Sequence, residues 1–416
     1  MSKTQDINYR PPSYFIKKRF FNNKPAVAGM IIIVIAHVIA ILGYLIMPDD
    51  TPLANDSAIQ IGKKTPGFSV DMLKLRRNIE LEDESFFEKM FKGEETEFSI
   101  IPISNYRIDS LIFFAQVYGM EEYTQYSIPE IVLPLYPQKV ASFNSTHGKN
   151  YTLQDDKIIY LDLNGDKQEI TKRELFKKLK TENIEHRTFL LGTDRAGRDL
   201  LSRLIYGARI SLSIGFISVI ISLSVGISLG ALAGFFGGVV DNFILWIMTV
   251  VWSIPSVMLV IAISLALQSK GVGVAFIAVG LTTWVEIARV VRGQIFSIKQ
   301  KLYIEAARAI GIKPLKIIYS HILPNMLGPL IVITTSNFAT AILVEAGLSF
   351  LGLSVQPPMP SWGMMINEGY HVMTTPDSWH MVLMPSLCVS LLVLAFNLFG
   401  NGLRDAYDPQ TVLNKR

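Results

Sequence analysis

Long runs of apolar residues without acidic or basic side chains are the feature of this 416-residue sequence that most restricts its fold. The first run, AVAGMIIIVIAHVIAILGYLIM, occupies residues 26–47. A helix needs about 20 apolar residues to cross the roughly 30 Å hydrocarbon core of a bilayer, so this run is long enough to span a membrane. It is also longer than the apolar part of a signal peptide and ends in Met47-Pro48-Asp49 rather than at a small-x-small cleavage site. We therefore interpret it as a retained membrane helix.

Apolar runs of similar length dominate the second half of the chain. They predict five more membrane helices, near residues 209–236, 241–268, 272–292, 326–350 and 381–401. Six spans place both chain ends on the same side of the membrane. Basic residues of the N-terminal tail, of the loop after the fourth span and of the C-terminal tail share that side. The positive-inside rule therefore predicts cytoplasmic tails at residues 1–25 and 406–416.

Residues 48–190 have the composition of a soluble domain. They contain 24 acidic and 18 basic residues, whereas the rest of the chain contains 11 acidic and 21 basic residues. Two β-prone runs flank Asn164-Gly165, a dipeptide typical of hairpin turns, and residues 171–184 show helical spacing. We predict a small α+β domain at 48–190, inserted between the first two membrane helices. The predicted topology places residues 48–205 outside the cytoplasm.

Several functional classes are excluded by what the sequence lacks. The basic excess flanks apolar spans and includes no basic stripe interleaved with aromatic residues, so we expect no nucleic-acid partner. Cys388 is the single cysteine, which excludes an internal disulfide and a cysteine-rich metal site. No G-x-x-x-x-G-K-[ST] phosphate loop occurs, so we expect the chain to bind no cofactor and to hydrolyse no ATP itself.

Residues 303–325, YIEAARAIGIKPLKIIYSHILPN, form a basic insert between two apolar runs. Good helix formers precede Gly311, which is placed to end a helix in a left-handed conformation, and Pro314 suits the first turn of a second helix. Leu315, Ile318 and Ile322 then recur on one predicted apolar face, and Pro324 is expected to end the element. A loop that only sets topology needs bases but no such caps, so a protein-docking role and a plain positive loop both remain open.

Several motifs in the same order resemble one family. The pattern Glu305-Ala306-Ala307-x3-Gly311-x9-His321-Ile322-Leu323-Pro324 resembles the coupling loop of type I ABC importer permeases, in particular the dipeptide, oligopeptide and nickel branch. LGTDRAGRDLLSRLIYGARISLSIG (191–215), EAGLSFLGLS (345–354), PPMPSWGMMI (357–366) and FNLFGNGLRDAYDP (396–409) resemble other parts of the same branch. The resemblance is weak over residues 14–47 and strong over 191–409, and the segment 48–190 is much longer than the family's usual connection.

The resemblance implies an all-α membrane protein with the type I ABC importer permease fold: six transmembrane helices, five of them in a transmembrane domain at 191–405, with a cytoplasmic coupling loop at 299–325. It implies that this loop contacts one of two separate ABC ATPase subunits, which would carry ATP and Mg²⁺. It also implies a second, non-identical permease subunit and an extracytoplasmic solute-binding protein. No catalytic residue is expected. The positions matching the family's coupling loop are Glu305, Ala306, Ala307, Gly311, His321, Leu323 and Pro324.

Charged residues inside predicted spans are candidates for a gate or solute pathway, because a charge in lipid costs about 3 kcal/mol on insertion scales. Glu286 and Arg289 lie near the inner end of the fourth span, where a local i, i+3 ion pair is the simpler interpretation. Arg292 follows them one turn later. Glu345 lies in the outer part of the fifth span, either as a carboxylate reaching toward the interface or as a pathway residue.

Three smaller patterns each allow two interpretations. Gly226, Gly230 and Gly234 form a small-residue stripe that serves either helix packing within the chain or a subunit interface. Asp194, Arg195, Arg198 and Asp199 form either a surface network of ion pairs or a seat for a binding protein. Asp162-x-Asn164-x-Asp166 superficially resembles a calcium loop but has Lys167 where a glycine belongs, which favours a simple hairpin turn.

Together these features predict a multi-pass permease subunit of an ATP-driven ABC importer in the cytoplasmic (inner) membrane, importing di- or oligopeptides. Import of nickel or another small solute is the alternative within the same family. An ATP-independent secondary carrier would show inverted repeats or paired ionisable groups at mid-membrane, which the sequence does not display. A membrane-anchored binding protein with its function in 48–190 is a further alternative.

Overall fold

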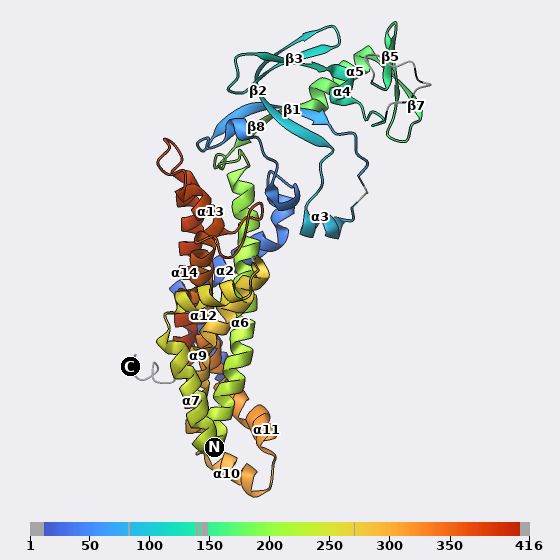
Figure 1. Ribbon diagram of the computed structural model, residues 1–416. Coiled ribbons are helices and arrows are strands. Elements are labelled where there is room, and N and C mark those ends of the chain that lie inside the picture. Colours follow the sequence, from blue (N-terminus) through green and yellow to red (C-terminus); the bar gives the residue numbers. More distant parts are fainter. Residues whose placement is uncertain are drawn as a thin grey trace, which may run out of the picture. The chain divides into compact units, whose positions relative to one another are not determined.

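We describe the fold from a computed structural model (Figure 1), in which residues 12–81, 84–138, 140, 143, 149–269 and 271–407 are described. Residues 1–11 of the predicted N-terminal tail and 408–416 of the C-terminal tail lie outside these residues. The chain divides into two compact units. The helical unit comprises Met1–Ala40, Gly207–Asn367 and Met384–Arg416, and the sheet-containing unit comprises Ile41–Tyr206 and Glu368–Leu383.

The helical unit is built from long apolar helices and their connections (Figure 1). Its helices, some of which continue into the other unit, are α1 (Pro12–Asn22), α2 (Lys24–Ile46), α6 (Leu200–Phe236), α7 (Gly238–Ser253), α8 (Ser256–Ala266), α9 (Val272–Ile298), α10 (Leu302–Ala309), α11 (Pro314–Ile317), α12 (Leu327–Phe350), α13 (Trp362–Tyr370) and α14 (His380–Tyr407). A π-helical turn at Ile318–Ile322 and a 3₁₀ turn at Leu323–Met326 join α11 to α12.

Among the described residues, five helices are long and apolar enough to cross a membrane, and a bent pair makes a sixth if it counts as one span. The five are Lys24–Ile46, Leu200–Phe236, Val272–Ile298, Pro314–Phe350 and His380–Tyr407. The bent pair is α7 and α8, whose axes differ by 95°. The prediction of one continuous helix over 241–268 is therefore wrong. Pro255 explains the break, because it has no N–H to donate and it favours extended backbone at Ile254, whose ψ is 128°.

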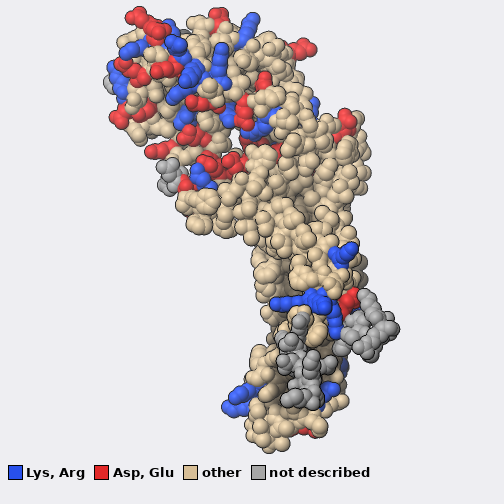
Figure 2. Space-filling model, turned by 180° about the vertical axis from the view of Figure 1, so that it is seen from behind, with Lys and Arg blue, Asp and Glu red and all other residues tan. Residues whose placement is uncertain are grey.

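Uncharged surface covers much of the helical unit (Figure 2). The first membrane helix, α2, carries its apolar side chains on the outside, where eight large ones are at least one-third exposed: Ile31, Val34, Ile35, Val38, Ile41, Leu42, Leu45 and Ile46. A helix of a water-soluble protein would bury such a stripe. This outward-facing apolar surface is what a lipid environment requires.

Close packing of α6 against α9 explains the glycine stripe. A Cβ added at Gly226 would lie 2.7 Å from Cβ of Ile287, and one at Gly234 would lie 2.9 Å from the carbonyl oxygen of Arg292. At Gly230 it would lie 2.5 Å from the carbonyl oxygen of Ala288. The prediction that the stripe packs within the chain is thus confirmed, since only hydrogen atoms fit between these backbones.

The sheet-containing unit holds two antiparallel sheets. One has five strands in the order β4-β3-β2-β1-β8 and the other three in the order β5-β6-β7. The strands are β1 (Phe68–Arg76), β2 (Phe98–Asp109), β3 (Ile112–Val117), β4 (Tyr123–Ser127), β5 (Tyr151–Gln154), β6 (Lys157–Leu161), β7 (Lys167–Thr171) and β8 (Ile184–Phe189). Helices α3 (Phe86–Lys92), α4 (Ile128–Val132) and α5 (Lys172–Lys178) accompany them, with short 3₁₀ turns at Pro52–Ala54 and Ile59–Ile61 and a π-helical turn at Leu179–Asn183. Buried apolar residues of β1, β3, β6, α4 and α5 share one core, as expected for an α+β unit.

The hairpin predicted around Asn164-Gly165 is confirmed. Strands β6 and β7 pair from Lys157 with Thr171 to Leu161 with Lys167. The Asp162 carboxylate accepts hydrogen bonds from the backbone N–H groups of Asn164 and Asp166, so it caps the turn. The helix predicted after the hairpin is α5, which begins with a capping box between Thr171 and Glu174.

Candidate functional site

The segment predicted as a coupling loop folds into two short helices joined by a glycine. Helix α10 ends in a Schellman motif, in which Gly311 has φ of 78° and its N–H donates to the carbonyl oxygen of Arg308. The N–H of Ile312 donates to the carbonyl oxygen of Ala307 at 3.1 Å, which closes the motif. Pro314 then begins α11 in its first turn. The predicted helix–turn–helix is therefore present, with a joint of defined geometry.

Pro324 does not end this element, contrary to the prediction. The helical path continues from Pro314 to Phe350 through the π-helical and 3₁₀ turns. The N–H of Leu323 donates to the carbonyl oxygen of Ile318, five residues earlier. Since Pro324 has no N–H and its ring crowds the preceding turn, widening that turn lets the helix pass the proline. The segment therefore leads directly into α12.

One face of the segment packs onto the ends of α6 and α9. Ile304, Ile317 and Ile322 are fully buried in a single cluster with residues of both helices. The Lys299 ammonium donates to the carbonyl oxygen of Gly234 at 2.9 Å, and the Arg308 guanidinium lies 4.8 Å from the Phe235 ring centre. The segment is thus anchored to two long helices.

The other face of the segment is apolar and exposed. Its large side chains are 46–83% exposed: Leu302, Tyr303, Ile310, Leu315 and Tyr319. Leu315 was predicted on the buried face, but it is 60% exposed and Ile317 is buried instead. Of the predicted coupling residues, Glu305, Ala306, Gly311 and Pro324 are exposed, His321 and Leu323 are half-buried, and Ala307 is buried. A contiguous exposed apolar face of this kind is typical of a protein-docking surface.

Among the ion pairs of the described residues, the predicted pair between Glu286 and Arg289 does not occur. The Arg289 guanidinium instead lies 4.5 Å from the Trp252 ring centre, a cation–π contact between α9 and α7. Glu286 lines a cavity of about 210 Å³ where the α7–α8 bend meets α9 and α12. Other lining residues include Trp252, Pro255, Thr282, Thr283, Thr340 and Val344. The local-pair prediction is therefore wrong, and the carboxylate is placed to face this cavity.

Arg292 pairs with a residue that the sequence did not single out. Its guanidinium donates to both carboxylate oxygens of Asp241 at 2.5 and 2.7 Å. Asp241 lies in the first turn of α7, so the bidentate pair fastens the start of α7 to the inner part of α9. The sequence could have indicated this pair, because Asp241 and Arg292 are an acidic and a basic residue inside apolar spans, where a mutual ion pair is favoured over two isolated charges.

Glu345 is completely buried, so the prediction of a carboxylate reaching toward the interface is wrong. Ser349 donates to it at 2.7 Å from the next turn of α12, and Ser211 of α6 donates at 3.3 Å. The hydroxyl of Ser361 in turn contacts Ser349 at 3.3 Å. Within the described contacts, Glu345 thus joins α6, α12 and the start of α13 through hydroxyl groups, and it does not line the cavity that contains Glu286.

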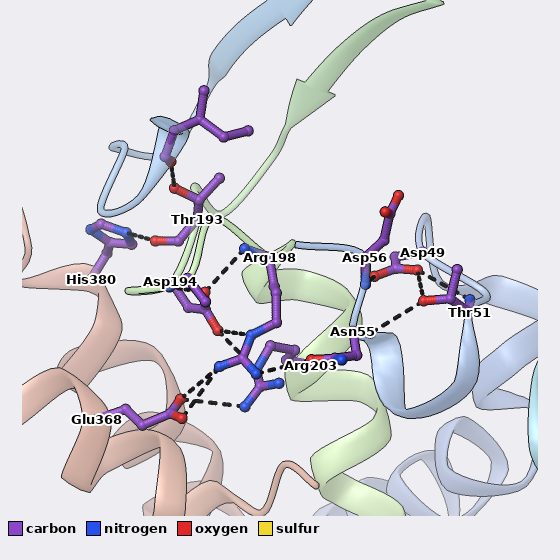
Figure 3. Close-up of polar contacts among 12 residues, drawn as sticks. Asp49, Thr51, Asn55, Asp56, Thr193, Asp194, Arg198, Arg203, Glu368 and His380 are labelled. Carbon is purple, nitrogen blue, oxygen red and sulfur yellow. Dashed lines mark hydrogen bonds and ion pairs between the residues drawn. The ribbon is translucent and has the colours of Figure 1, made fainter. Parts of the chain in front are cut away.

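The motif at 194–199 builds a buried ionic network inside the sheet-containing unit (Figure 3). Arg198 pairs with Asp194 at 2.6 Å and Arg203 pairs with Asp194 at 3.2 Å. Both guanidinium groups also lie 3.3 Å from Glu368, so two cations face two carboxylates. The prediction of a surface network is wrong for Asp194, Arg198 and Asp199, which are at most 5% exposed, whereas Arg195 is exposed.

This network joins three separate stretches of the chain. Arg198 donates a hydrogen bond to the Asn55 side chain (Figure 3). The Thr193 hydroxyl donates to the Ile61 carbonyl oxygen, and the Thr193 carbonyl oxygen lies within hydrogen-bond distance of the His380 ring. Burial raises the pKa of Asp199, an effect that hydrogen bonds from Ser202 partly offset. The network explains why these residue types occur together, because a buried charge requires a partner. These contacts tie the three stretches to one another.

No group of three or more His, Cys, Asp or Glu side chains in the described part of the chain is arranged to hold a metal ion. The features that remain are candidate membrane helices, a cavity between them, and an exposed apolar face on the segment that joins α9 to α12. This combination defines a membrane-embedded protein.

Comparison with known proteins identifies the family. Residues 226–412 match the family described as "Binding-protein-dependent transport system inner membrane component", and residues 15–63 match the "N-terminal TM domain of oligopeptide transport permease C". A glutathione transport system permease protein, GsiD, of Pectobacterium atrosepticum is 42% identical over 220 residues, which are 53% of this chain and 72% of that protein. A di/tripeptide transport system permease protein, DppC, of Pseudomonas aeruginosa is 44% identical over 222 residues, with the same shares covered.

The chain therefore belongs to the family of binding-protein-dependent transport system inner membrane components, as its motifs predicted. Among solved structures, an inward-facing conformation of the MetNI methionine ABC transporter is similar, with 21% identity and a TM-score of 0.42, covering 49% of this chain and 96% of that one. The two family models leave residues 64–225 unmatched, a range that includes all eight named strands.

Proposed function

We propose that this chain is a membrane-spanning subunit of an ATP-driven importer of di- or oligopeptides. Relatives named for glutathione and for di/tripeptides support this substrate class. The observation that carries the proposal is the exposed apolar face of residues 302–319, since it gives a partner that supplies energy a surface on which to act. Two ABC ATPase subunits would bind ATP and Mg²⁺ and contact this face.

The remaining assembly follows from the same assignment. A second, non-identical permease subunit completes the pathway, and an extracytoplasmic solute-binding protein delivers the peptide. Both chain ends and the coupling loop at 299–325 lie in the cytoplasm, whereas the strands of the sheet-containing unit lie on the outer side. The positive-inside bias of the loops supports this orientation.

Force on the exposed face reaches the cavity by a short route. Ile304 and Ile317 are buried against α6 and α9, and the segment continues into α12. Glu286 of α9 and Thr340 of α12 both line the 210 Å³ cavity. A displacement of α10 and α11 by the ATPase would therefore move two walls of this cavity, because packed helices shift as rigid elements.

Three charged residues would act along this route. Glu286 faces the cavity, where its carboxylate would attract the ammonium group of a peptide. Arg289, stacked on Trp252, would hold the α7–α8 bend against α9 and so act as a gate residue. Glu345 would keep α6 and α12 together while the helices move.

Two matched serine substitutions test the docking surface. Ile310→Ser lies on the exposed face at 77% exposure, and Ile59→Ser lies in the sheet-containing unit at 79% exposure. Burying an isoleucine in an interface is worth about 1.5–3 kcal/mol, so Ile310→Ser is expected to lower ATPase affinity roughly 10- to 150-fold. Ile59→Ser is expected to leave it unchanged. The measurement is the amount of ATPase that co-purifies with the permease from co-expressing membranes.

Transport assays complete the test. Glu305→Lys and Gly311→Pro are expected to reduce uptake of a labelled dipeptide into proteoliposomes containing the whole transporter. Normal co-purification and normal uptake with Ile310→Ser would overturn the docking assignment. Uptake of nickel without uptake of any dipeptide would overturn the substrate class while leaving the docking surface intact.

A further inference from the structure

Helix α3, Phe86–Lys92, presents an apolar face with no role in the transport scheme. A capping box starts the helix, with the Ser85 hydroxyl accepting from the Glu88 N–H and the Glu88 carboxylate accepting from Ser85. Phe86, Phe87 and Phe91 are 62%, 68% and 57% exposed. With Met90 they occupy positions i, i+1, i+4 and i+5, so they share one side of the helix.

Charged residues occupy the opposite side of α3. Glu88 pairs with Lys92 at 3.5 Å, and Lys89 pairs with Glu94 at 2.6 Å. These pairs leave the phenylalanine side without charge. The helix is therefore amphipathic, with its apolar side turned outward from the unit that carries it, which is the reverse of a core-packed helix.

The end of α3 is tied to the point where the first membrane helix ends. Gly93 has φ of 88°, and a Cβ there would lie 2.7 Å both from the Tyr44 ring and from the Asp50 carbonyl oxygen. The N–H of Glu94 donates to that same oxygen at 2.9 Å. Tyr44 belongs to the last turn of α2, and its hydroxyl accepts from the N–H of Leu53. Contacts within one unit thus hold α3 beside the end of α2.

The last turn of α2 marks where this candidate span leaves the apolar layer of a membrane. Leu45 and Ile46, the last residues of α2, are 45% and 49% exposed and apolar, as lipid-facing residues are. Interfacial helices carry Trp, Phe or Leu on the face that enters the boundary between headgroups and acyl chains, and lysines beside them reach the headgroups. A helix with phenylalanines on one side and lysines on the other has the composition of an interfacial helix.

We propose that α3 lies in the bilayer interface, with Phe86, Phe87 and Phe91 inserted at the boundary between headgroups and acyl chains. The occupant of its apolar face is lipid, a conclusion that follows from the contact of Gly93 with Tyr44 and from the exposed end of α2. This anchor would fix the start of the inserted unit at the membrane surface. The proposal depends on the membrane insertion of α2 and not on the identity of the transported solute.

Site-directed spin labelling tests the proposal, and the single cysteine makes it practicable. In a Cys388→Ser background, a nitroxide is attached at Phe87→Cys on the apolar side or at Lys92→Cys on the charged side. Phe86→Cys provides a second position on the apolar side. All three positions are exposed, so the labels should not disturb folding. Each full-length variant is reconstituted with its partner subunits into phosphatidylethanolamine–phosphatidylglycerol vesicles, and collision rates with oxygen and with a water-soluble nickel chelate are measured.

The lipid assignment predicts that oxygen reaches positions 86 and 87 several-fold more readily than the nickel chelate does, with both positions buried about 5–10 Å into the boundary between headgroups and acyl chains. Position 92 should show the reverse preference. Equal access of the nickel chelate to positions 87 and 92 would mean that the face is in water and would overturn the proposal. Protection of positions 86 and 87 from both reagents would mean that a protein covers the face, which would overturn it as well.

Discussion

The tight contact between α6 and α9 allows one substitution to be predicted quantitatively. Gly230→Ala would place a Cβ 2.5 Å from the Ala288 carbonyl oxygen and 2.9 Å from Cβ of Val291. Ordinary carbon–oxygen contacts begin at about 3.3 Å, so the helices must separate by roughly 0.5–1 Å. We expect the substitution to destabilise the helical unit because the neighbouring contacts at Gly226 and Gly234 loosen together.

The expected magnitude follows from packing and helix propensity. A radial gap of about 0.5–1 Å forfeits a quarter to a half of each dispersion contact, and overpacking of this kind costs about 1–3 kcal/mol. Alanine also favours a helix over glycine by about 1 kcal/mol, which partly hides the cost. Gly293→Ala on α9 is the matched control, since a Cβ there has no neighbour within 4 Å. The difference between the two variants should therefore be about 1–3 kcal/mol, or roughly 5- to 150-fold in the unfolding equilibrium.

Unfolding of the purified chain by sodium dodecyl sulfate in mixed micelles measures this difference. We expect Gly230→Ala to unfold at a lower detergent fraction than Gly293→Ala. Coincident unfolding curves for the two variants would refute the packing argument. If Gly230→Ala instead left unfolding unchanged but abolished association with the partner permease, the stripe would serve a subunit interface.

Three further predictions concern individual polar groups. Asp241→Ala should lower the thermal stability of the detergent-solubilised chain because it leaves Arg292 unpaired, and a second substitution, Arg292→Met, should recover part of the loss. Glu345→Gln should be tolerated, whereas Glu345→Leu should cost about 1–3 kcal/mol in the same measurement by leaving buried hydroxyls without an acceptor; equal stability of both variants would contradict this. Hydrogen bonds from the backbone and side chain of Ser85 lower the pKa of Glu88 below that of an ordinary glutamate. The ionised carboxylate therefore stabilises the cap of α3 fully at pH values above the ordinary glutamate pKa, and this stabilisation is lost as the pH falls through the lowered pKa. The mobility of a spin label at position 92 should therefore stay constant down to about pH 4.3 and rise only below it.

Local sequence patterns predicted the elements whose causes are local. An apolar run long enough to span the bilayer identified α2, and a hairpin dipeptide identified the turn between β6 and β7. Gly311 identified the end of α10, because a left-handed residue at that position is a requirement of the backbone itself. These predictions needed no knowledge of distant contacts.

Interactions between distant residues could not be predicted in the same way. Asp241 and Arg292 are 51 positions apart, and the residues alone do not indicate that α7 starts beside the inner part of α9. The pattern Glu286-x-x-Arg289 suggested a local pair, yet Trp252 offered the guanidinium an aromatic face from another helix. Pro255 lies where its span bends by 95°, whereas Pro324 is passed by a widened turn, so a proline in the sequence does not by itself predict which of the two occurs.

Leu315 was predicted on the buried face of its helix but is exposed, and this error has a different origin. Residues 315–319, LKIIY, are apolar on nearly every side of a short helix, so periodicity alone cannot say which side faces inward. A helix that only packed against its own chain would need one apolar side. This one buries Ile317 and Ile318 against α6 and α9 and still exposes Leu315 and Tyr319. We propose that a second protein covers this excess apolar surface, and a serine variant should therefore weaken partner binding without weakening the fold.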